Sequence, residues 1–300
     1  LLPLWAKQGC TVESIDQGFM GNTYLPLPPV PEQKAIAAFL DRETKRIDGL
    51  IRKREKLIVL LQEKRAALIS HAVTKGLNPS AKMKPSGIDW LGNIPAHWET
   101  DKIKYNTFSC SGGTPNTENQ DYWNGDIPWV SPKDMKASRI SATEDSITEL
   151  GLKESASRLI DENTVLIVVR SGILKHTIPV AINVVPVSIN QDMKALFTKE
   201  KVTSDYLFYF INGVQENLLP LWRKQGCTVE SIEQEFMGNT CLPIPPVSEQ
   251  KAIAEYLDTE TKKIDGLLEK EQQIIERMKE YRSALISAAV TGKIDVRETV

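Results

Sequence analysis

The chain has 300 residues and a formal net charge of −2 at pH 7, so the charge balance gives no support for a nucleic-acid partner. No apolar run approaches the length of a membrane span, and no signal peptide heads the sequence, so we expect a cytoplasmic protein with no membrane partner. None of the four cysteines forms a CxxC pair, which argues against a zinc site. The length suggests two domains.

One stretch of the sequence occurs twice at a constant offset. Residues 25–36 read Leu-Pro-Leu-Pro-Pro-Val-Pro-Glu-Gln-Lys-Ala-Ile, and residues 242–253 repeat this segment with two changes. Both copies have their prolines in front and none in the long segment that follows, which suits the first turn of a helix. Apolar residues then recur at steps of three and four. The repeat therefore predicts two long helices, at 32–76 and 248–293.

The two helices are expected to pack on each other. About 40 residues make about 60 Å of helix, and a single apolar stripe of that length needs a partner along it. Polar residues interrupt the stripe at Thr44 and Arg65, and at the equivalent Thr261 and Arg282, which usually fixes the register at a cost in stability. The first helix is basic and the second is about balanced in charge. We predict a two-helix coiled coil, whatever its function.

The rest of the chain predicts an α+β protein. Residues 1–24 copy residues 218–241, which close a domain in the second copy. No such domain precedes the first copy, so we expect residues 1–31 to be the tail of a first domain that was removed or never existed. Residues 77–247 are expected to form a mixed α/β domain, entered through a linker rich in turn formers, and residues 294–300 a C-terminal tail.

Within 77–247, segments rich in β-branched residues and bounded by turn formers predict strands. These segments are 127–131, 164–169, 180–184 and 193–197. Short helices are expected near 131–135 and 150–154, and a longer one at 204–212. Four apolar residues of the linker region are expected to pin it to the core: Trp90, Leu91, Ile94 and Trp98.

No catalytic constellation is visible. The histidines His71, His97 and His176 are scattered, with no partner at ligand spacing. The sequence contains no GxGxxG, P-loop or GxSxG segment. Asp41 and Glu43, like their repeat equivalents, are spaced too tightly within a helix for a nuclease site. We therefore expect no enzyme activity, cofactor or metal in this chain.

The repeated Leu-Pro-x-Pro-Pro-Val-x-Glu-Gln-Lys-Ala-Ile-Ala segment, which feeds a helix ending in Arg-x-Ala-Leu-Ile-Ser, resembles the conserved region of type I restriction–modification specificity (S, HsdS) subunits. Segments of the linker resemble that family as well: 75–79, 83–92 and 94–98. Further segments look like parts of its target recognition domain: 111–115, 127–135, 169–174 and 190–194. The resemblance covers nearly the whole chain.

The resemblance implies a non-catalytic subunit that gives a restriction–modification enzyme its DNA sequence specificity. In such subunits each recognition domain reads half of a bipartite site in double-stranded DNA, and two antiparallel helices hold the domains apart. About 60 Å of helix spans roughly 18 base pairs, which suits that role. Methylation (M) subunits, which carry S-adenosylmethionine, dock on the helices. Restriction (R) subunits carry the ATP and Mg²⁺ chemistry.

The sequence departs from the family because it looks like a truncated form that lacks most of the first recognition domain. It is then expected to read one half-site as a monomer, or a palindromic bipartite site as a homodimer formed through the helices. The alternative is a scaffold or inhibitor that sequesters methylation subunits without full site recognition. An unrelated coiled-coil scaffold with an α/β head is a third interpretation.

The DNA-binding candidates are chosen for their chemistry. Glycines allow the backbone to approach a phosphate closely, a guanidinium matches O6 and N7 of guanine, and carboxamides match the edge of adenine. The remaining candidates lie in loops that follow expected strands. The full set is Gly112, Gly113, Thr114, Ser131, Lys133, Arg170, Ser171, Lys175, Asn190 and Gln191. For each, the alternative role is to form a turn or a hydrogen bond at the edge of the core.

Overall fold

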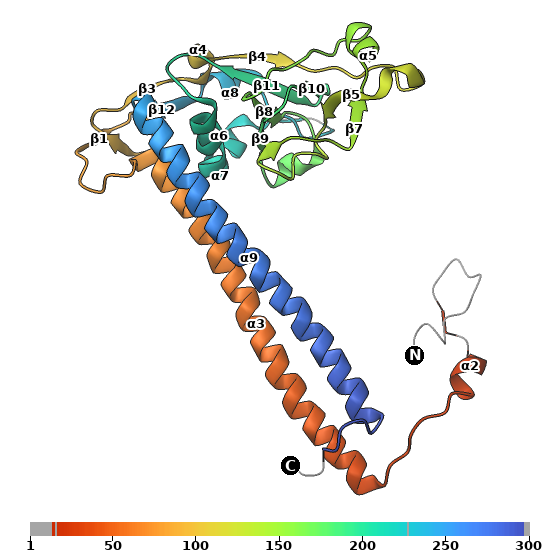
Figure 1. Ribbon diagram of the computed structural model, residues 1–300. Helices are drawn as coiled ribbons and strands as arrows, with labels where there is room; N and C mark the ends of the chain where they lie inside the picture. The colour runs from red at the N-terminus through yellow and green to blue at the C-terminus, as the bar shows by residue number, and fades with distance from the viewer. Residues whose placement is uncertain (1–13, 16, 227, 297–300) are drawn as a thin grey trace. The chain divides into compact units, whose positions relative to one another are not determined.

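The computed structural model describes residues 14–15, 17–226 and 228–296 (Figure 1). The chain divides into two compact units, Leu1–Leu60 with Leu267–Val300, and Leu61–Gly266. The parts of the two expected tails before residue 14 and after residue 296 lie outside the described residues. None of the helices in the described ranges is long and apolar enough to cross a membrane.

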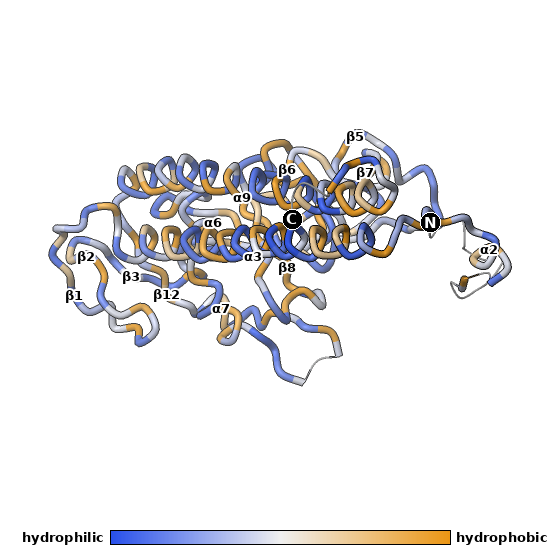
Figure 2. The backbone as a smooth tube through the Cα atoms, turned by 90° about the horizontal axis from the view of Figure 1, so that it is seen from below, coloured by the Kyte–Doolittle hydropathy of each residue, from blue (hydrophilic) through white to orange (hydrophobic). Residues whose placement is uncertain are grey.

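Both predicted long helices are present. Helix α3 spans Val30–Lys75 and helix α9 spans Val247–Val290, so each helix contributes a part to each unit. In Figure 2, apolar positions recur among polar ones along both helices. In the first unit the apolar seam buries Ile47 and Ile51 of α3 against Ile275 of α9. Partly buried residues extend this seam: Ile58, Met278 and Leu285.

Ion pairs fix the direction and register of the helix pair. Three of them join α3 to α9 at 2.8 Å: Asp48–Arg282, Arg54–Glu271 and Arg65–Asp265. The first two lie in the first unit and the third lies in the second. As the residue number on α3 rises, the number of its partner on α9 falls. The helices therefore run antiparallel within the pair, as the predicted fold class requires.

The sequence repeat organises these contacts. Arg65 and Arg282 occupy equivalent positions of the two copies, and each binds an aspartate that is equivalent to the other's. Arg54 and Glu271 are also equivalent to each other, and they face one another directly. A position that faces its own equivalent marks the centre of an antiparallel pairing of two like helices. The repeat has diverged at this position to Arg in one copy and Glu in the other.

The second unit contains two main sheets. A five-stranded sheet has the order β4-β11-β8-β9-β6, in which only the β9–β6 pair is parallel. Its strands are β4 (Thr107–Ser111), β6 (Arg139–Ile140), β8 (Val165–Val168), β9 (Val180–Asn183) and β11 (Met193–Thr198). A three-stranded sheet has the order β10-β5-β7, with β10 parallel to β5. Its strands are β5 (Trp123–Val130), β7 (Asp145–Ile147) and β10 (Ser188–Ile189).

Smaller elements complete the described chain. Two short antiparallel pairs join β1 (Met83–Pro85) with β2 (Asn93–Pro95), and β3 (Glu99–Lys102) with β12 (Cys241–Ile244). The remaining helices are α2 (Gln17–Gly21), α4 (Ile103–Asn106), η1 (Gln120–Tyr122), α5 (Glu149–Lys153), η2 (Gly172–Lys175), α6 (Ser204–Gly213), α7 (Gln215–Trp222) and α8 (Gln234–Asn239).

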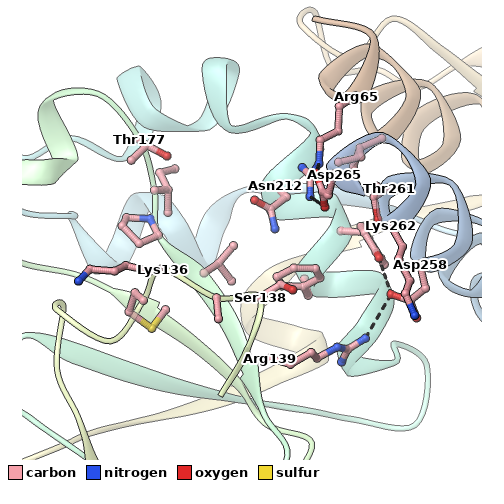
Figure 3. Close-up of a pocket in the computed structure, with 18 of the residues that line it drawn as sticks. Arg65, Lys136, Ser138, Arg139, Thr177, Asn212, Asp258, Thr261, Lys262 and Asp265 are labelled. Carbon is pink, nitrogen blue, oxygen red and sulfur yellow. Dashed lines mark hydrogen bonds and ion pairs between the residues drawn. The ribbon is translucent and has the colours of Figure 1, made fainter. Parts of the chain in front are cut away.

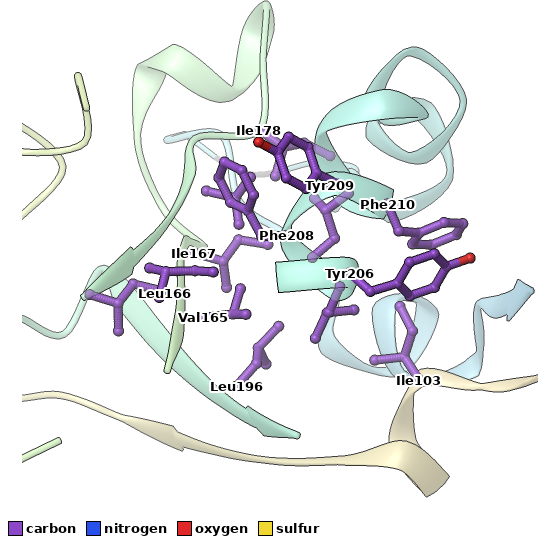
Figure 4. Close-up of a cluster of buried hydrophobic side chains, with 14 of the residues drawn as sticks. Ile103, Val165, Leu166, Ile167, Ile178, Leu196, Tyr206, Phe208, Tyr209 and Phe210 are labelled. Carbon is purple, nitrogen blue, oxygen red and sulfur yellow. The ribbon is translucent and has the colours of Figure 1, made fainter. Parts of the chain in front are cut away.

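Helix α6 is the centre of the core of the second unit. Its side chains pack over β8, β9 and β11, as Figure 4 shows for Phe208, whereas Tyr206 points toward Ile103. The fully buried Tyr206 hydroxyl donates hydrogen bonds to the carbonyls of Val73 on α3 and of Pro243 on β12. Burial raises the pKa of Tyr206 well above its usual value, so the hydroxyl stays neutral and remains a donor. The Tyr206 side chain thus links α6 to both α3 and β12.

Most of the predicted elements of this unit are confirmed. The four expected strands correspond to β5, β8, β9 and β11, and the helices expected near 150–154 and 204–212 are α5 and α6. The helix expected at 131–135 is wrong, because the segment forms turns. There the Asp134 carboxylate accepts hydrogen bonds from the Ser131 backbone and hydroxyl and from the Glu144 backbone, which competes with helical bonding.

The linker is more ordered than expected, because it contains the β1–β2 pair. Its apolar residues do pin it to the core as predicted: Leu91, Ile94 and Trp98 are buried, and Trp90 packs against the same cluster.

The start of α9 is anchored by a buried glutamine. The side chain of Gln250 accepts a hydrogen bond from the Thr203 backbone at 2.9 Å and donates to the carbonyls of Lys201 and Pro245. Its repeat equivalent, Gln33, is exposed and donates to the carbonyl of Pro28, the bond that corresponds to Gln250–Pro245. The same residue type therefore donates to the equivalent proline carbonyl before each helix, but only Gln250 also holds a loop of the domain.

We predict that Gln250→Ala lowers the free energy of unfolding by about 1–3 kcal/mol, because it leaves buried backbone groups without partners. Chemical denaturation measures this loss. The matched control is Gln33→Ala, whose effect is expected to stay within about 0.5 kcal/mol. Equal losses in the two variants would contradict the anchoring role of Gln250.

Candidate nucleic-acid interface

The predicted DNA-binding residues lie in four segments, which follow β4, β5, β8 and β10. Strands β4 and β8 both end beside the start of β11, where Ser111 pairs with Lys194 and Val168 pairs with Met193. The parallel strands β5 and β10 also end together. The segments that follow these strands therefore gather around the turn at 190–192, which connects β10 to β11.

This turn is built by its own side chains. Asn190 is buried, and its side-chain oxygen accepts a hydrogen bond from the Asp192 backbone at 3.0 Å, which is an Asx turn. Gln191 is exposed and accepts a hydrogen bond from the Thr114 hydroxyl, so the turn is joined to the segment after β4. Asn190 thus has a structural role, whereas Gln191 and Thr114 remain on the surface.

Arg170 lies beside the same turn. Its Nε is 2.8 Å from Oδ1 of Asp192, while the arginine side chain is 59% exposed. Within the part of the chain that the structure describes, the terminal nitrogens of Arg170 have no recorded partner. The ion pair lacks hydrogen-bond geometry at Oδ1 of Asp192, and it leaves both terminal nitrogens of Arg170 outside the pair. That geometry suits a bidentate contact with guanine or with a phosphate.

The glycines of the segment after β4 are required by the protein itself. A Cβ on Gly112 would lie 1.8 Å from the carbonyl oxygen of Ile189, and one on Gly113 would lie 2.7 Å from the backbone of Ala156. The carbonyl of Gly113 also accepts a hydrogen bond from the indole of Trp129. Close approach to neighbouring backbone therefore accounts for both glycines, and their contact with phosphate stays a prediction.

The other candidates differ in exposure. Ser131 is buried and donates to the carboxylate of Asp134 at 2.9 Å. Ser171 caps η2 by accepting a hydrogen bond from the Ile173 backbone. Lys133 and Lys175 are exposed, and the nearest recorded carboxylate to Lys133 is Asp145 at 3.8 Å. Among the described residues, neither lysine forms a hydrogen bond or ion pair with the turn at 190–192, so they stay separate predictions.

Residues 98–277, more than half of the chain, match the family described as "Type I restriction modification DNA specificity domain". The chain belongs to this family. The resemblance noted in the sequence is therefore confirmed at the level of the family.

Two curated specificity subunits are similar to the chain in sequence. It is 37% identical over 224 residues to the EcoR124I/EcoR124II specificity subunit of Escherichia coli, covering 72% of this chain and 55% of that protein. It is 32% identical over 196 residues to the MjaIX specificity subunit of Methanocaldococcus jannaschii, covering 63% of this chain and 43% of that protein. The chain thus spans about half the length of the curated relatives it matches.

A solved structure shares the fold of this specificity-family member. It comes from work on the complex assembly and conformational transition of the type I R-M system. The TM-score is 0.72 at 17% identity, with 94% of this chain and 65% of that chain covered.

Two charged residues in or beside the turn at 190–192 of the specificity domain, Asp192 and Lys194, were not selected from the sequence. Asp192, which orients Arg170, is distant in sequence and meets it only through the pairing of β8 with β11. Lys194 is buried at the start of β11, and burial lowers its pKa. The one sequence signal for Asp192 is its place two residues after Asn190, where an Asx turn was foreseeable.

We predict that Gly112→Ala lowers the free energy of unfolding by about 1–3 kcal/mol, because the added methyl group overlaps the Ile189 carbonyl. Urea denaturation measures the change. Gly172→Ala is the matched control, since a Cβ there meets nothing within 4 Å, and its effect is expected within about 0.5 kcal/mol. A neutral Gly112→Ala variant would show that the loop shifts freely and that the glycine serves another purpose.

Proposed function

We propose that this chain supplies DNA sequence specificity to a type I restriction–modification enzyme, and that the domain at 77–247 reads a half-site in duplex DNA. One observation carries the proposal: in a member of the specificity-domain family, the exposed Thr114, Arg170 and Gln191 gather on one edge of the domain. These three side chains come from loops after different strands, the arrangement expected of a surface that reads an irregular ligand on a rigid scaffold.

Each exposed residue has a chemical role in this proposal. Arg170, buttressed by Asp192, reads guanine through its terminal nitrogens. Gln191 pairs with a base edge, and Thr114 orients it through their hydrogen bond. Lys133 and Lys175 contact phosphates, which add affinity without sequence information. The buried Ser131 and the capping Ser171 shape the loops, as do Gly112, Gly113 and Asn190.

We further propose that the helix pair docks methylation subunits. In the first unit, α3 exposes basic residues beside apolar ones, such as Lys53 and Lys56 next to Val59 and Leu60, which are each 50% exposed. An apolar groove of about 260 Å³ lies between the helices in the same unit, lined by Ile47, Leu50, Ile274, Met278 and Tyr281 together with Arg46 and Arg277. Exposed apolar surface rimmed by charge is typical of a protein-binding site.

In such an assembly the chain itself stays non-catalytic. S-adenosylmethionine belongs to the methylation subunits, and ATP and Mg²⁺ belong to the restriction subunits. This chain contributes the choice of DNA sequence and the surface on which the other subunits meet.

A second arrangement is favoured by a difference between the two repeat copies. Leu242 and Ile244 are buried in β12, whereas their equivalents Leu25 and Leu27 are 67% and 87% exposed. We propose that this exposed apolar segment of the first copy packs on another chain. Two chains would then read a palindromic bipartite site together. The rival is a scaffold that sequesters methylation subunits without sequence-selective methylation.

We expect Arg170→Ala to relax recognition at one base pair and to weaken half-site binding by about 1–3 kcal/mol, because one bidentate contact is lost. Selection of duplexes from a random library by wild type and variant, followed by affinity measurement, tests this. Lys251→Ala is the control, since Lys251 is an exposed residue on α9. An unchanged sequence preference in Arg170→Ala would remove Arg170 from the reading surface.

Light scattering measures the mass in solution of the chain alone and with its methylation subunit. The mass gives the number of copies of the chain in each complex, which distinguishes the two arrangements. We expect a complex that contains two copies of the chain and methylates a palindromic bipartite site. One copy per complex with sequence-selective methylation would indicate a half-site reader. One copy without selective methylation would favour the sequestering role, and the lack of any complex would contradict docking on the helices.

A further inference from the structure

A polar cavity lies where the domain meets the long helices in the second unit. Its volume is about 720 Å³, and residues of α3, α6, α9 and the β6 strand line it (Figure 3). Close apolar contacts adjoin this cavity, because Ile69, which lines it, also packs against α6. A Cβ on Gly213 of α6 would lie 2.9 Å from the Ile69 side chain and 3.1 Å from that of Val73. The junction therefore combines a close apolar contact with an open, charged side.

Arg139 crosses the open side of this junction. It lies on β6, at the edge of the five-stranded sheet. Its Nη1 is 2.7 Å from Oδ1 of Asp205 on α6. Its Nη2 is 3.5 Å from Oδ1 of Asp258 on α9, and Figure 3 labels Arg139 and Asp258. The guanidinium also lies over the ring of Phe208, 5.8 Å from its centroid. Arg139 thus contacts α6 and α9 at the same time.

Asp258 receives a second contact from the domain. The hydroxyl of Tyr209, on α6, donates a hydrogen bond to the same carboxylate oxygen that faces Arg139. Burial would lower the pKa of Arg139, but its hydrogen bond with Asp205 and the nearby carboxylates raise it, so the arginine remains charged. Burial and the bond to Asp258 raise the pKa of Tyr209, so its hydroxyl stays a donor. The contacts therefore persist across physiological pH.

These contacts contribute little to the stability of the junction. The side chain of Asp258 is 53% exposed, and ion pairs in water have small net energies. The junction is held instead by buried apolar residues of both helices, including Ile69, Val73, Ile253 and Leu257. The apolar contacts hold the two parts together, whereas the ion pair, which joins the edge strand β6 to α9, restrains the angle between them.

We propose that Arg139 is a positioning residue that, through Asp258, fixes the angle between the recognition domain and helix α9. This inference rests on the proposed function in one respect: methylation subunits dock on the helices, while the domain holds the DNA. The angle then decides where the target base of a bound half-site lies relative to the docked subunit. Half-site affinity depends on the domain alone, whereas methylation depends on the angle.

The angle is measured directly in the full chain by electron–electron double resonance. Spin labels replace Lys153 on α5 and Lys263 on α9, which are exposed residues of the second unit, in a chain whose native cysteines are changed to serine. Asp258→Asn removes the charge that faces Arg139 and keeps an acceptor for Tyr209. We expect this variant to broaden or shift the distance distribution while its melting temperature stays close to that of the labelled parent.

The matched control is Asp265→Asn. Asp265 lines the same cavity and binds Arg65 at 2.8 Å, but this pair joins α3 to α9 and does not reach the domain. We expect the control to leave the distance distribution unchanged. Arg139→Gln is the second test variant, used if Asp258→Asn fails to fold. A distribution unchanged from the parent in a folded Asp258→Asn or Arg139→Gln variant would overturn the proposal.

The functional test compares binding with methylation. A duplex selected from a random library by the wild-type chain is the probe, and methyl transfer from labelled S-adenosylmethionine is measured with the methylation subunit. We expect Asp258→Asn to keep its affinity for the duplex and to lose methylation by up to about 100-fold, the scale of loss that follows a misplacement of about 1 Å. If Asp258→Asn lost DNA binding and methylation equally, the positioning role proposed for Arg139 would be contradicted. If the wild-type chain selects no duplex, the proposed function fails, and the distance measurement alone decides the role of Arg139.

Discussion

The structure depends on the burial of two helix ends in one core. The last turns of α3, with Ile69 and Val73, and the first turns of α9, with Ile253 and Leu257, belong to the same apolar cluster as the sheet. An isolated helix is marginal in water, and packing of its apolar face is what stabilises it. The domain therefore stabilises the parts of both long helices that belong to the second unit.

This shared core also explains which parts of the fold the sequence predicts. The helices and the strands β8, β9 and β11 have strong periodic or β-branched patterns, and they are confirmed. Strands such as β1, β2 and β12 contain proline or few β-branched residues, and they exist because a neighbouring segment pairs with them. The error at 131–135 arose because the side chain of Asp134 competes with helical hydrogen bonds.

The sequence predicts the loops of the candidate site, but it does not predict the contacts between them. Loops that follow strands were the correct places to look for exposed polar residues, and Arg170 and Gln191 are exposed there. The sequence cannot give strand register, so it did not show that Asp192 faces Arg170. Nor can it tell a glycine that admits a ligand from one that admits a neighbouring strand, as at Gly112. These distinctions depend on contacts between residues far apart in the chain.

The pairing of Arg54 with Glu271 has a consequence for how copies of the chain can associate. Two α3 helices brought together in the same register would place Arg54 against Arg54, and two α9 helices would place Glu271 against Glu271. Like charges at such short range repel, whereas the unlike pair attracts. The chain therefore distinguishes its own two halves despite their shared ancestry. Helices exchanged between copies would therefore still join the α3 of one chain to the α9 of another.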